Sequence, residues 1–568
     1  MCGIIGHAGK GENIVPKCLQ KLEYRGYDSA GIAALNSSGI EVSKGVGTVD
    51  EAVEAPQGSA AIGHTRWATH GGVTQTNAHP HTDPDGRVAV VHNGIIDNHS
   101  DLREEVGEGR FESETDTEVI PHLLAQHLKE GLDPRAAAEE VTDRLEGSYA
   151  AVALLEGGQM VAFKQGAPLA VARNQDEHFF SSDVVPLLEH VNEAAFLQDG
   201  DIAILDSDLR VFNQGREVER DSQEIQWEGG SATRGDFDHF TRKEIGEQPE
   251  TIKRATFQDE ESLTEAAGML EKARTVWITG CGTSSYAADH MRDYLAPEVD
   301  ARSIQSHELE YRTDEVGDDD AVVAVSQSGE TKDLLAALEG IEAPVLSFLN
   351  VAQSSLERRS DHTIHINAGP EVGVASTKAY TAQLTAMKTV AAELKDQEQV
   401  LESLRSTAEK AERLVKASES LAEKLHGALK GEDAYFVGRY QRFHSAKEAS
   451  LKLKELSYIH SEAFPAGEFK HGTLALVEEG TPVVGFVDEE TADETLSNLE
   501  EASSRGAEII GVGPKDRDVY DLHVPIPEDP NREMLEVIPF QMLALKTALD
   551  RGNDPDRPRN LAKSVTVK

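Results

Sequence analysis

A cysteine stands at position 2 of the sequence, directly after the initiator methionine, in the run MCGIIG. If Met1 is removed, Cys2 carries a free α-amine with a reference pKa of about 7.7–8.0 beside a thiol with a pKa of about 8.5. Both groups then titrate near neutral pH, so the amine can act as the base that activates the thiol. The pattern predicts a nucleophile that supplies its own base, and an exposed terminal cysteine without a role is the alternative.

Hydroxyl side chains gather in SQSGET, a polar turn between the strand-like run DAVVAV and a helical pattern. Hydroxyls and the N–H groups of a helix N-terminus suit a phosphate group. Thr283 and Ser284 open a neighbouring predicted helix and can join the same cradle, whereas ordinary helix capping is the alternative. The residues of the turn that we expect to bind phosphate are Ser326, Gln327, Ser328 and Thr331.

Three charged side chains share one face of a later helical segment. In EASLKLKELS, Glu448, Lys452 and Glu455 are four and then three residues apart, the spacing of neighbours on a helix. Lys454 points elsewhere and is expected to face solvent. An exposed ladder of ion pairs explains the same spacing, so a catalytic use stays open on these residues alone.

Two kinds of segment must position these groups. Residues 2–218 are rich in short strand-like runs such as GIAAL, VAVVHNG and YAAVALLE, which predicts stacked sheets with some helical cover. A polar, glycine-bearing linker and a connecting helix follow over residues 219–265. From residue 266 strands alternate with helices, which predicts parallel sheets.

The alternating pattern occurs twice. The segment TVWITGCGTSSYAADHMRDYL has its counterpart about 160 residues later in DAYFVGRYQRFHSAKEASLKLKEL. We infer a duplicated α/β unit, with copies over 266–401 and 426–559 and a tail over 560–568; two unrelated α/β layers are the alternative. The turn of the second copy is DEETAD, whose carboxylates repel phosphate, so we expect the first copy to hold it.

Composition limits the partners. With 101 acidic and 55 basic residues, the net charge is −46, which argues against a nucleic-acid or anionic-membrane partner. The acidity runs along the whole chain, as in a halophilic surface. Three cysteines form no disulfide framework, and no apolar run approaches the ~18 residues of a membrane span. With no evident signal peptide, a cytoplasmic location is expected.

The motifs LEYRGYDSAG, GHTRWATHG, NAHPH, VHNGIIDNH and SETDTEV together resemble the class II glutamine amidotransferases, which are N-terminal nucleophile hydrolases. The resemblance implies that Asn93 and the Gly94 N–H form an oxyanion hole. It implies that Arg66 binds the carboxylate of glutamine and Asp116 its ammonium group, whereas a surface ion pair and a helix N-cap are the alternatives. The glutamine site would also include Trp67, Thr69, His70, His79 and His92, of which His79 and His92 brace it through hydrogen bonds.

Histidine is frequent in this region, which raises the question of a metal. Metal ligation needs a regular spacing and would silence a reactive thiolate. No zinc pattern fits, so we expect neither a metal nor another cofactor. The histidines concerned are His64, His70, His79, His81, His92 and His99.

The duplicated unit resembles the sugar isomerase domains through GCGTS, SQSGET, EVGVASTKAY and SEAFPAGEFKHG, and the chain closes with DRPRNLAKSVTVK. The resemblance implies that Glu455 transfers the proton, with Lys452 and Glu448 beside it. It implies that His471 opens the sugar ring and that Lys563 forms a Schiff base with a ketose, the tail packing between the two halves. The sugar phosphate would also contact Val374, Ala375 and Ser376.

The expected fold is therefore a multidomain α/β chain, an αββα sandwich followed by two flavodoxin-like isomerase domains. The resemblance implies transfer of ammonia from L-glutamine to D-fructose 6-phosphate, giving D-glucosamine 6-phosphate, through a sealed channel gated by Trp67. A homodimer is also implied. An enzyme acting on another phosphosugar, a deglycase-like enzyme and a non-catalytic sugar-phosphate sensor remain as alternatives.

Overall fold

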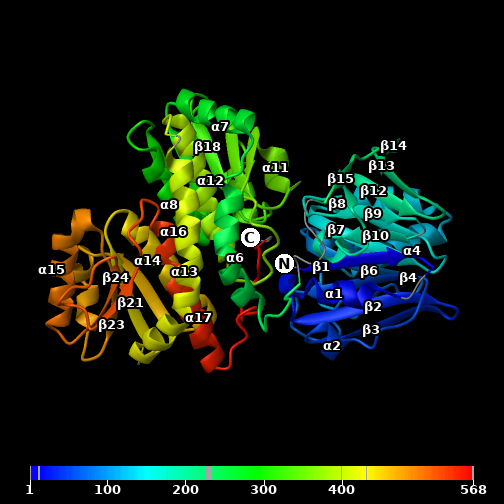
Figure 1. Cartoon of the computed structure of the whole chain (residues 1–568). Coiled ribbons are helices and arrows are strands. Elements are labelled where there is room, and N and C mark those ends of the chain that lie inside the picture. Colours follow the sequence, from blue (N-terminus) through cyan, green and yellow to red (C-terminus); the bar gives the residue numbers. More distant parts are fainter. Residues whose placement is uncertain are drawn as a thin grey trace. The chain divides into compact units, whose positions relative to one another are not determined.

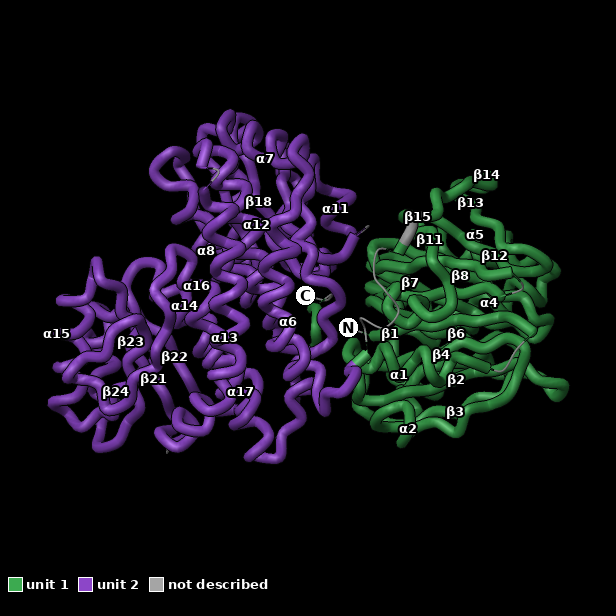
Figure 2. The backbone as a smooth tube through the Cα atoms, viewed as in Figure 1, with its two compact units in different colours: residues 1–233, 562–568 green, residues 234–561 purple. Residues whose placement is uncertain are grey.

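The computed structural model describes the whole chain except residues 1, 11–12, 69, 176, 226–232, 353, 398, 430 and 566–568. The chain divides into two compact units, residues 1–233 with 562–568, and residues 234–561 (Figure 2). Figure 1 labels the elements of each unit. We describe each unit by itself.

Unit 1 contains two antiparallel sheets. The first has the order β15-β11-β9-β10-β1-β4-β2-β3, that is Ser222–Glu224, Glu193–Phe196, Ala170–Asn174, Glu177–Ser181, Gly3–Ala8, Ala60–Arg66, Ser29–Asn36 and Gly39–Val46. The second has the order β14-β13-β12-β8-β7-β6-β5, that is Arg216–Val218, Leu209–Asn213, Asp201–Leu205, Met160–Gln165, Gly147–Leu155, Val88–Ile96 and His81–Thr82. Strand β15 lies inside the predicted linker and pairs with β11.

The two sheets pack face to face, because Ile4 and Phe180 of the first share a core with Val91 and Val152 of the second. Helices α1 (Val15–Gln20) and α2 (Val49–Ala52) cover the outer face of the first sheet. Helices α3, α4 and α5 cover the second, over His99–Val106, Val119–Lys129 and Pro134–Thr142. The predicted αββα sandwich is confirmed.

Unit 2 contains two five-stranded parallel sheets with the same strand order, second-first-third-fourth-fifth, which is the flavodoxin-like order. The first sheet is β17-β16-β18-β19-β20, over Ala301–Gln305, Val276–Gly280, Ala321–Val325, Val345–Leu349 and His362–His365. The second is β22-β21-β23-β24-β25, over His460–Pro465, Asp433–Gly438, Pro482–Phe486, Glu508–Gly513 and Leu522–Pro525. The predicted duplication is confirmed.

The duplication extends to backbone detail. Gly282 precedes helix α8 (Thr283–Leu295) with φ 54° and ψ −128°, and Tyr440 precedes helix α14 (Gln441–Ser457) with φ 51° and ψ −127°. Glycine adopts this positive φ freely, whereas a tyrosine there is strained. The second copy therefore keeps the geometry of a turn that its own residue does not favour.

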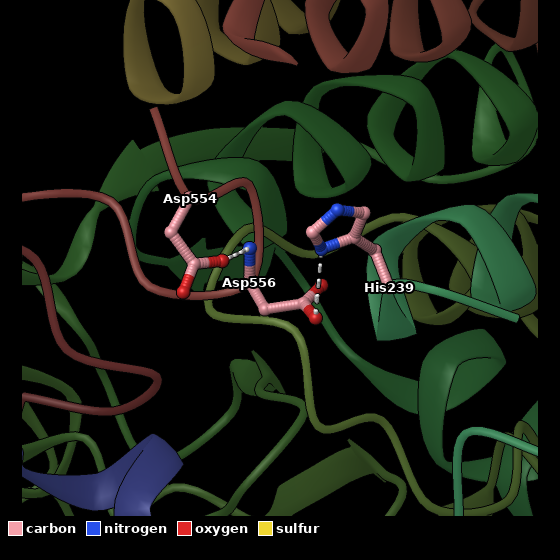
Figure 3. A group of neighbouring side chains, drawn as sticks. All are labelled: His239, Asp554 and Asp556. Atoms are coloured by element: carbon pink, nitrogen blue, oxygen red, sulfur yellow. Dashed lines mark hydrogen bonds and ion pairs between the residues drawn. The ribbon is translucent and has the colours of Figure 1, made fainter. Parts of the chain in front are cut away.

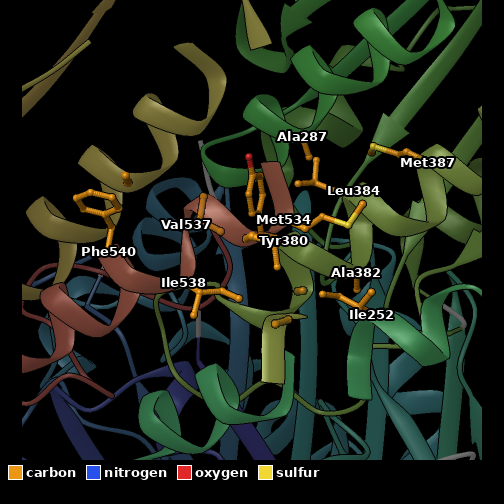
Figure 4. Packing of buried hydrophobic residues seen from close by; sticks show 14 of the residues in the cluster. Ile252, Ala287, Tyr380, Ala382, Leu384, Met387, Met534, Val537, Ile538 and Phe540 are labelled. Carbon is orange, nitrogen blue, oxygen red and sulfur yellow. The ribbon is translucent and has the colours of Figure 1, made fainter. Parts of the chain in front are cut away.

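The helices of unit 2 join its two sheets into one hydrophobic core. Figure 4 shows part of this core, where Tyr380 and Leu384 of α12 (Lys378–Leu394) lie near Met534. Met387 and Ile538 belong to the same cluster. The long helix α13 (Gln399–Ala428) packs on α6 and α17. The remaining helices are α6 (Phe240–Ala255), α7 (Glu260–Lys272), α9 (Ser306–Leu309), α10 (Lys332–Ala337), α11 (Ser355–Arg359), α15 (Ala492–Ser503), α16 (Glu533–Glu536) and α17 (Ile538–Asp550).

Candidate active sites

Cys2 lies directly before β1, which pairs with β4, so the thiol is held beside the end of β4. The Trp67 backbone N–H donates to Cys2 Sγ at 3.3 Å, and the thiol can donate to the Trp67 carbonyl at 3.6 Å. Burial raises the pKa of the Cys2 thiol, and the Trp67 N–H opposes that rise. The thiol is therefore neutral at neutral pH, and a nucleophilic role requires a base at the site.

Asn93 and Gly94 lie in the middle of β6, next to Cys2. The Asn93 side-chain amide donates to the Cys2 carbonyl at 2.9 Å. Gly94 has φ +120°, and a Cβ at this position would lie 2.0 Å from the Ser148 carbonyl oxygen, so only glycine fits. The packing of the two sheets thus places Asn93, one of the two predicted oxyanion donors, beside the predicted nucleophile.

Arg66 ends β4 and is only 4% exposed. Its guanidinium donates to the carbonyls of His70, Gly71 and Gly72, so the alternative of a surface ion pair is wrong. Burial lowers the pKa of Arg66 and nearby negative groups partly restore it. The three loop carbonyls fix the Arg66 guanidinium, the planar group that we predict to bind the carboxylate of glutamine.

Asp116 is also buried, and its Oδ2 accepts the Ile96 backbone N–H at 2.8 Å. Helix α4 begins at Val119 with Glu118 at its N-cap, so the alternative that Asp116 caps this helix is wrong. The bond to Ile96 ties Asp116 to the strand that carries Asn93. Its role toward an ammonium group stays a prediction.

His79 and His92, the two histidines predicted to brace this site, both contact Thr117. The Thr117 hydroxyl lies 2.8 Å from His92 Nδ1 and 3.3 Å from His79 Nε2. The backbone N–H of His92 donates to His79 Nδ1 at 3.3 Å. Burial lowers the pKa of both rings, so both are neutral. They contact the residue that follows Asp116 in the chain, and their role in bracing the glutamine site stays a prediction.

The other predicted members of the glutamine site have separate surroundings. The Trp67 ring packs edge-on against Tyr27 at 5.7 Å between centroids, and the His70 ring lies 5.7 Å from that of His99. Thr69 lies outside the described residues.

In unit 2, helix α14 brings the three predicted charged groups together. Lys452 Nζ lies 2.6 Å from Glu455 Oε2 and 3.5 Å from Glu448 Oε1. The side chains of Glu448 and Lys452 are 0% and 1% exposed, that of Glu455 is 19% exposed, and Lys454 is exposed as expected. The alternative of a solvent-exposed ladder of ion pairs is therefore wrong.

Burial strongly affects this group of charges. It raises the pKa of Glu448 to about 8, although Lys452 opposes the rise. Burial alone would lower the pKa of Lys452, but Glu448 and Glu455 raise it overall. The helix therefore carries a stable ammonium group between two carboxyl groups, and one of those can hold a proton near neutral pH.

The SQSGET turn follows β18 and ends at Thr331, the N-cap of α10. Ser326 Oγ accepts the Gly329 N–H at 2.9 Å, and the Glu330 N–H donates to Ser328 Oγ at 3.2 Å. Gly329 has φ +68°, and a Cβ there would lie 2.0 Å from Ser354 Oγ. The hydroxyls and Gln327 therefore follow a tight, glycine-dependent turn at the carboxyl end of the sheet, where α/β proteins bind ligands.

Thr283 connects the two isomerase copies. Its hydroxyl accepts a hydrogen bond from Lys452 Nζ at 3.0 Å and lies 3.4 Å from Glu448 Oε1. Lys452 and Glu448 are 169 and 165 residues away from Thr283 in the chain. Thr283 thus contacts the charged group of α14, and its predicted part in a phosphate cradle stays a prediction. Ser284, its neighbour, accepts a hydrogen bond from Gln383 at 3.1 Å.

Ser376, the last residue of the predicted phosphate-binding segment 374–376, donates to a buried carboxylate that was not predicted from the sequence. Glu371 accepts the N–H groups of Thr377 and Ala379 at 2.9 and 3.0 Å and the Ser376 hydroxyl at 3.1 Å. It therefore occupies the N-terminus of α12. Glu371 lies five to eight residues before these groups, so an acidic residue shortly before a predicted helix was the available signal. Gln383 lies 99 residues from Ser284, so the sequence carries no local signal for that contact.

Comparison with known proteins identifies the two units. Residues 64–189 match the glutamine amidotransferase domain, and residues 269–392 and 430–550 each match the SIS domain. The chain is 39% identical over 597 residues to the glutamine–fructose-6-phosphate aminotransferase (isomerizing) of Methanothermobacter thermautotrophicus and 40% identical over 603 residues to that of Thermococcus kodakarensis, each covering 100% of both chains. The chain belongs to the glutamine–fructose-6-phosphate aminotransferase (isomerizing) family.

A solved structure supports the same family at the level of the isomerase unit. The C-terminal domain of the glucosamine–fructose-6-phosphate aminotransferase from Francisella tularensis aligns with a TM-score of 0.53 and 34% identity, over 57% of this chain and 100% of that one. The glutamine–fructose-6-phosphate aminotransferase family thus accounts for the amidotransferase half and for both isomerase copies.

Two further residues were assigned by resemblance to this family. His471 is solvent-exposed in the turn Phe469–His471. Lys563 is half-buried in the tail segment that belongs to unit 1. Their roles in a glutamine–fructose-6-phosphate aminotransferase stay predictions.

Three possible metal ligands, His239, Asp554 and Asp556, lie together elsewhere in unit 2 (Figure 3). His239 Nδ1 lies 3.6 Å from Asp556 Oδ2. The Asp556 carboxylate accepts the N–H groups of Phe240 and Thr241 at 2.9 and 2.7 Å. Helix capping at the start of α6 therefore explains the arrangement.

In the described part of the chain, no helix is both long and apolar enough to cross a membrane.

Proposed function

We propose that the chain converts D-fructose 6-phosphate and L-glutamine to D-glucosamine 6-phosphate and L-glutamate. The observation that carries this proposal is its 39–40% identity to aminotransferases of this family over the full length of both chains. The site geometries support it, because unit 1 groups Cys2 with Asn93, and unit 2 groups Glu448, Lys452 and Glu455 on one helix.

In the first half-reaction, Cys2 attacks the amide carbonyl of glutamine. The α-amine that removal of Met1 would expose takes the thiol proton. A base is needed because burial raises the pKa of this thiol, which is therefore protonated at neutral pH. A C–S bond forms, the C–N bond breaks and ammonia leaves, and water then hydrolyses the thioester to glutamate. Asn93 and Gly94 stabilise the oxyanion, while Arg66 and Asp116 bind the two charged ends of glutamine.

In the second half-reaction, the hydroxyls of the SQSGET turn and the 374–376 segment hold the phosphate of the sugar. His471 opens the ring, and Lys563 forms a Schiff base at C2, releasing water. Ammonia replaces Lys563 at C2. Glu455 then moves a proton between C1 and C2, and the Lys452 ammonium group 2.6 Å away stabilises its carboxylate form.

Ammonia has to pass from the first reaction to the second in its neutral form, away from water, and we propose Trp67 as the gate of that path. We also propose a cytoplasmic homodimer with no nucleic-acid or membrane partner. The functional segments would be 2–218 for glutamine hydrolysis, 219–265 for connection, 266–401 and 426–559 for the isomerase copies and 560–568 for the catalytic tail.

A direct assay tests the proposal. The purified chain, with processing of Met1 verified by intact mass, is supplied with glutamine and fructose 6-phosphate without ATP or added metal. We expect equal amounts of glucosamine 6-phosphate and glutamate. Binding of fructose 6-phosphate without any product would instead support a sensor, and amination of a different phosphosugar would overturn the proposed substrate.

A further inference from the structure

His64 is a fully buried residue of β4 whose ring faces the oxyanion-hole strand. Its Nε2 lies 2.9 Å from the His92 carbonyl oxygen and 3.1 Å from Asn93 Oδ1. Its ring stacks on that of His79 with 4.1 Å between centroids and 22° between planes. Stacking and two hydrogen bonds thus fix both the position and the rotation of this ring.

The partners of His64 determine where its proton lies. A backbone carbonyl only accepts hydrogen bonds, so Nε2 must carry the hydrogen that points toward His92 and Asn93. Burial lowers the pKa of His64 to about 3, so the ring is neutral and Nδ1 carries no proton at neutral pH. The ring therefore presents one N–H donor, in a fixed direction.

This donor and the Cys2 carbonyl select the same orientation of the Asn93 amide. The oxygen and nitrogen of an amide are nearly equal in shape, so packing alone does not choose between the two orientations. A donor at Nε2 requires the oxygen of Asn93 on its side, which turns Nδ2 toward Cys2, where it donates to the Cys2 carbonyl at 2.9 Å. The opposite orientation would direct an oxygen at the charge that develops on the substrate.

We propose that His64 is a positioning residue of the glutamine site, whose Nε2–H holds the Asn93 amide with its N–H groups toward the reacting carbonyl. The inference rests on the proposed hydrolysis of glutamine at Cys2. It gives the histidine-rich segment a role in transition-state stabilisation, separate from the predicted bracing of the site by His79 and His92.

The test compares glutamine hydrolysis by the full-length wild type, four single variants and one double variant. His64→Phe keeps an aromatic ring for the stack but removes the donor, and His64→Gln restores an N–H donor. Asn93→Ala removes the oxyanion donor itself. His81→Phe is the matched control, because His81 is equally buried and its ring also packs against His79 (4.7 Å), but its Nε2 contacts Thr115 at 3.1 Å.

We expect His64→Phe to lower kcat by about 10²-fold, as loss of one oxyanion donor does. KM for glutamine should change little, and His64→Gln should recover part of the rate. Asn93→Ala should lower kcat by a similar factor. The double variant His64→Phe/Asn93→Ala should lower kcat no further, because both changes remove the same interaction. Alkylation of Cys2 by iodoacetamide should stay at the wild-type rate, since displacement at a saturated carbon develops no oxyanion.

Three results would overturn the role of His64: independent, multiplying losses in the double variant, an equal loss in His81→Phe, or a matching loss of alkylation in a folded His64→Phe. If His64→Phe does not fold, a His64→Gln rate as low as that of Asn93→Ala also rejects it. Wild type without glutamine hydrolysis, after removal of Met1, would instead overturn the proposed function.

Discussion

The ammonium group of Lys452 lies 2.6 Å from the carboxylate of Glu455, one helical turn away and with almost no solvent contact on the lysine side. A second carboxyl group, that of Glu448, lies 3.5 Å from the same nitrogen. One cation thus serves two acidic groups in unequal surroundings, since Glu448 is fully buried and Glu455 is partly open. We therefore predict that Glu455, the more accessible carboxylate, exchanges the proton with a substrate.

Glu455→Gln should block formation of glucosamine 6-phosphate, because an amide cannot accept the C1–C2 proton. We expect a loss of about 10²–10⁴-fold, the range of general acid–base catalysis, with glutamine hydrolysis retained. The control is Lys454→Ala, on the exposed face of the same helix, which should behave as wild type. Unchanged exchange of the C1 proton with solvent in Glu455→Gln would remove this residue from the mechanism.

The protonation of Glu448 should make stability depend on pH. Burial raises its pKa from 4.5 to about 8, so between these values the folded chain holds a proton that the unfolded chain has released. The free energy of unfolding therefore decreases as pH rises through this window. Glu448→Gln should remove this contribution, so the midpoint of thermal unfolding should fall less from pH 5 to pH 8 than in wild type. Calorimetric curves with equal pH dependence in both proteins would contradict the assignment.

Lys563→Arg keeps the positive charge of the tail but cannot form a Schiff base. It should abolish synthesis of glucosamine 6-phosphate and leave glutamine hydrolysis measurable. In wild type, reduction with borohydride in the presence of fructose 6-phosphate should attach the sugar to Lys563, as peptide mass spectrometry would show. Normal synthesis by Lys563→Arg would refute the covalent role.

Removal of Met1 should control the glutamine site alone. A chain that keeps Met1 has an amide nitrogen at Cys2 in place of an amine, so the buried thiol lacks its proposed base. We expect no glutamine hydrolysis from such a chain but unimpaired binding of fructose 6-phosphate. Intact mass measured on the assayed sample decides the point, and full hydrolysis with Met1 present would reject the one-residue nucleophile.

The net charge of −46 should make the fold depend on salt. The Debye length falls from about 10 Å at 0.1 M to about 3 Å at 1 M, which screens repulsion between surface carboxylates. The midpoint of thermal unfolding should rise with KCl over this range, whereas sucrose at equal osmolality should not reproduce the full effect. A flat or falling midpoint would argue against a halophilic surface.

Local spacing was enough for much of the fold. Alternating strands and helices predicted both parallel sheets, and the helical period placed Glu448, Lys452 and Glu455 on one face. The short strand Ser222–Glu224 was not predicted, because its residues are polar and lack a strand pattern. It forms by pairing with β11. The predicted linker therefore contains part of a sheet.

The sequence by itself determined the kinds of chemistry and the elements that carry them, because residue type and helical or strand period are properties of neighbouring residues. Only the tertiary structure decided which distant groups lie together: Thr283 with Lys452, Gln383 with Ser284, and His64 with Asn93. The physical reason is that hydrogen bonds between segments depend on sheet register and helix packing. Those are set by burial of the whole core, and no single stretch of residues encodes them.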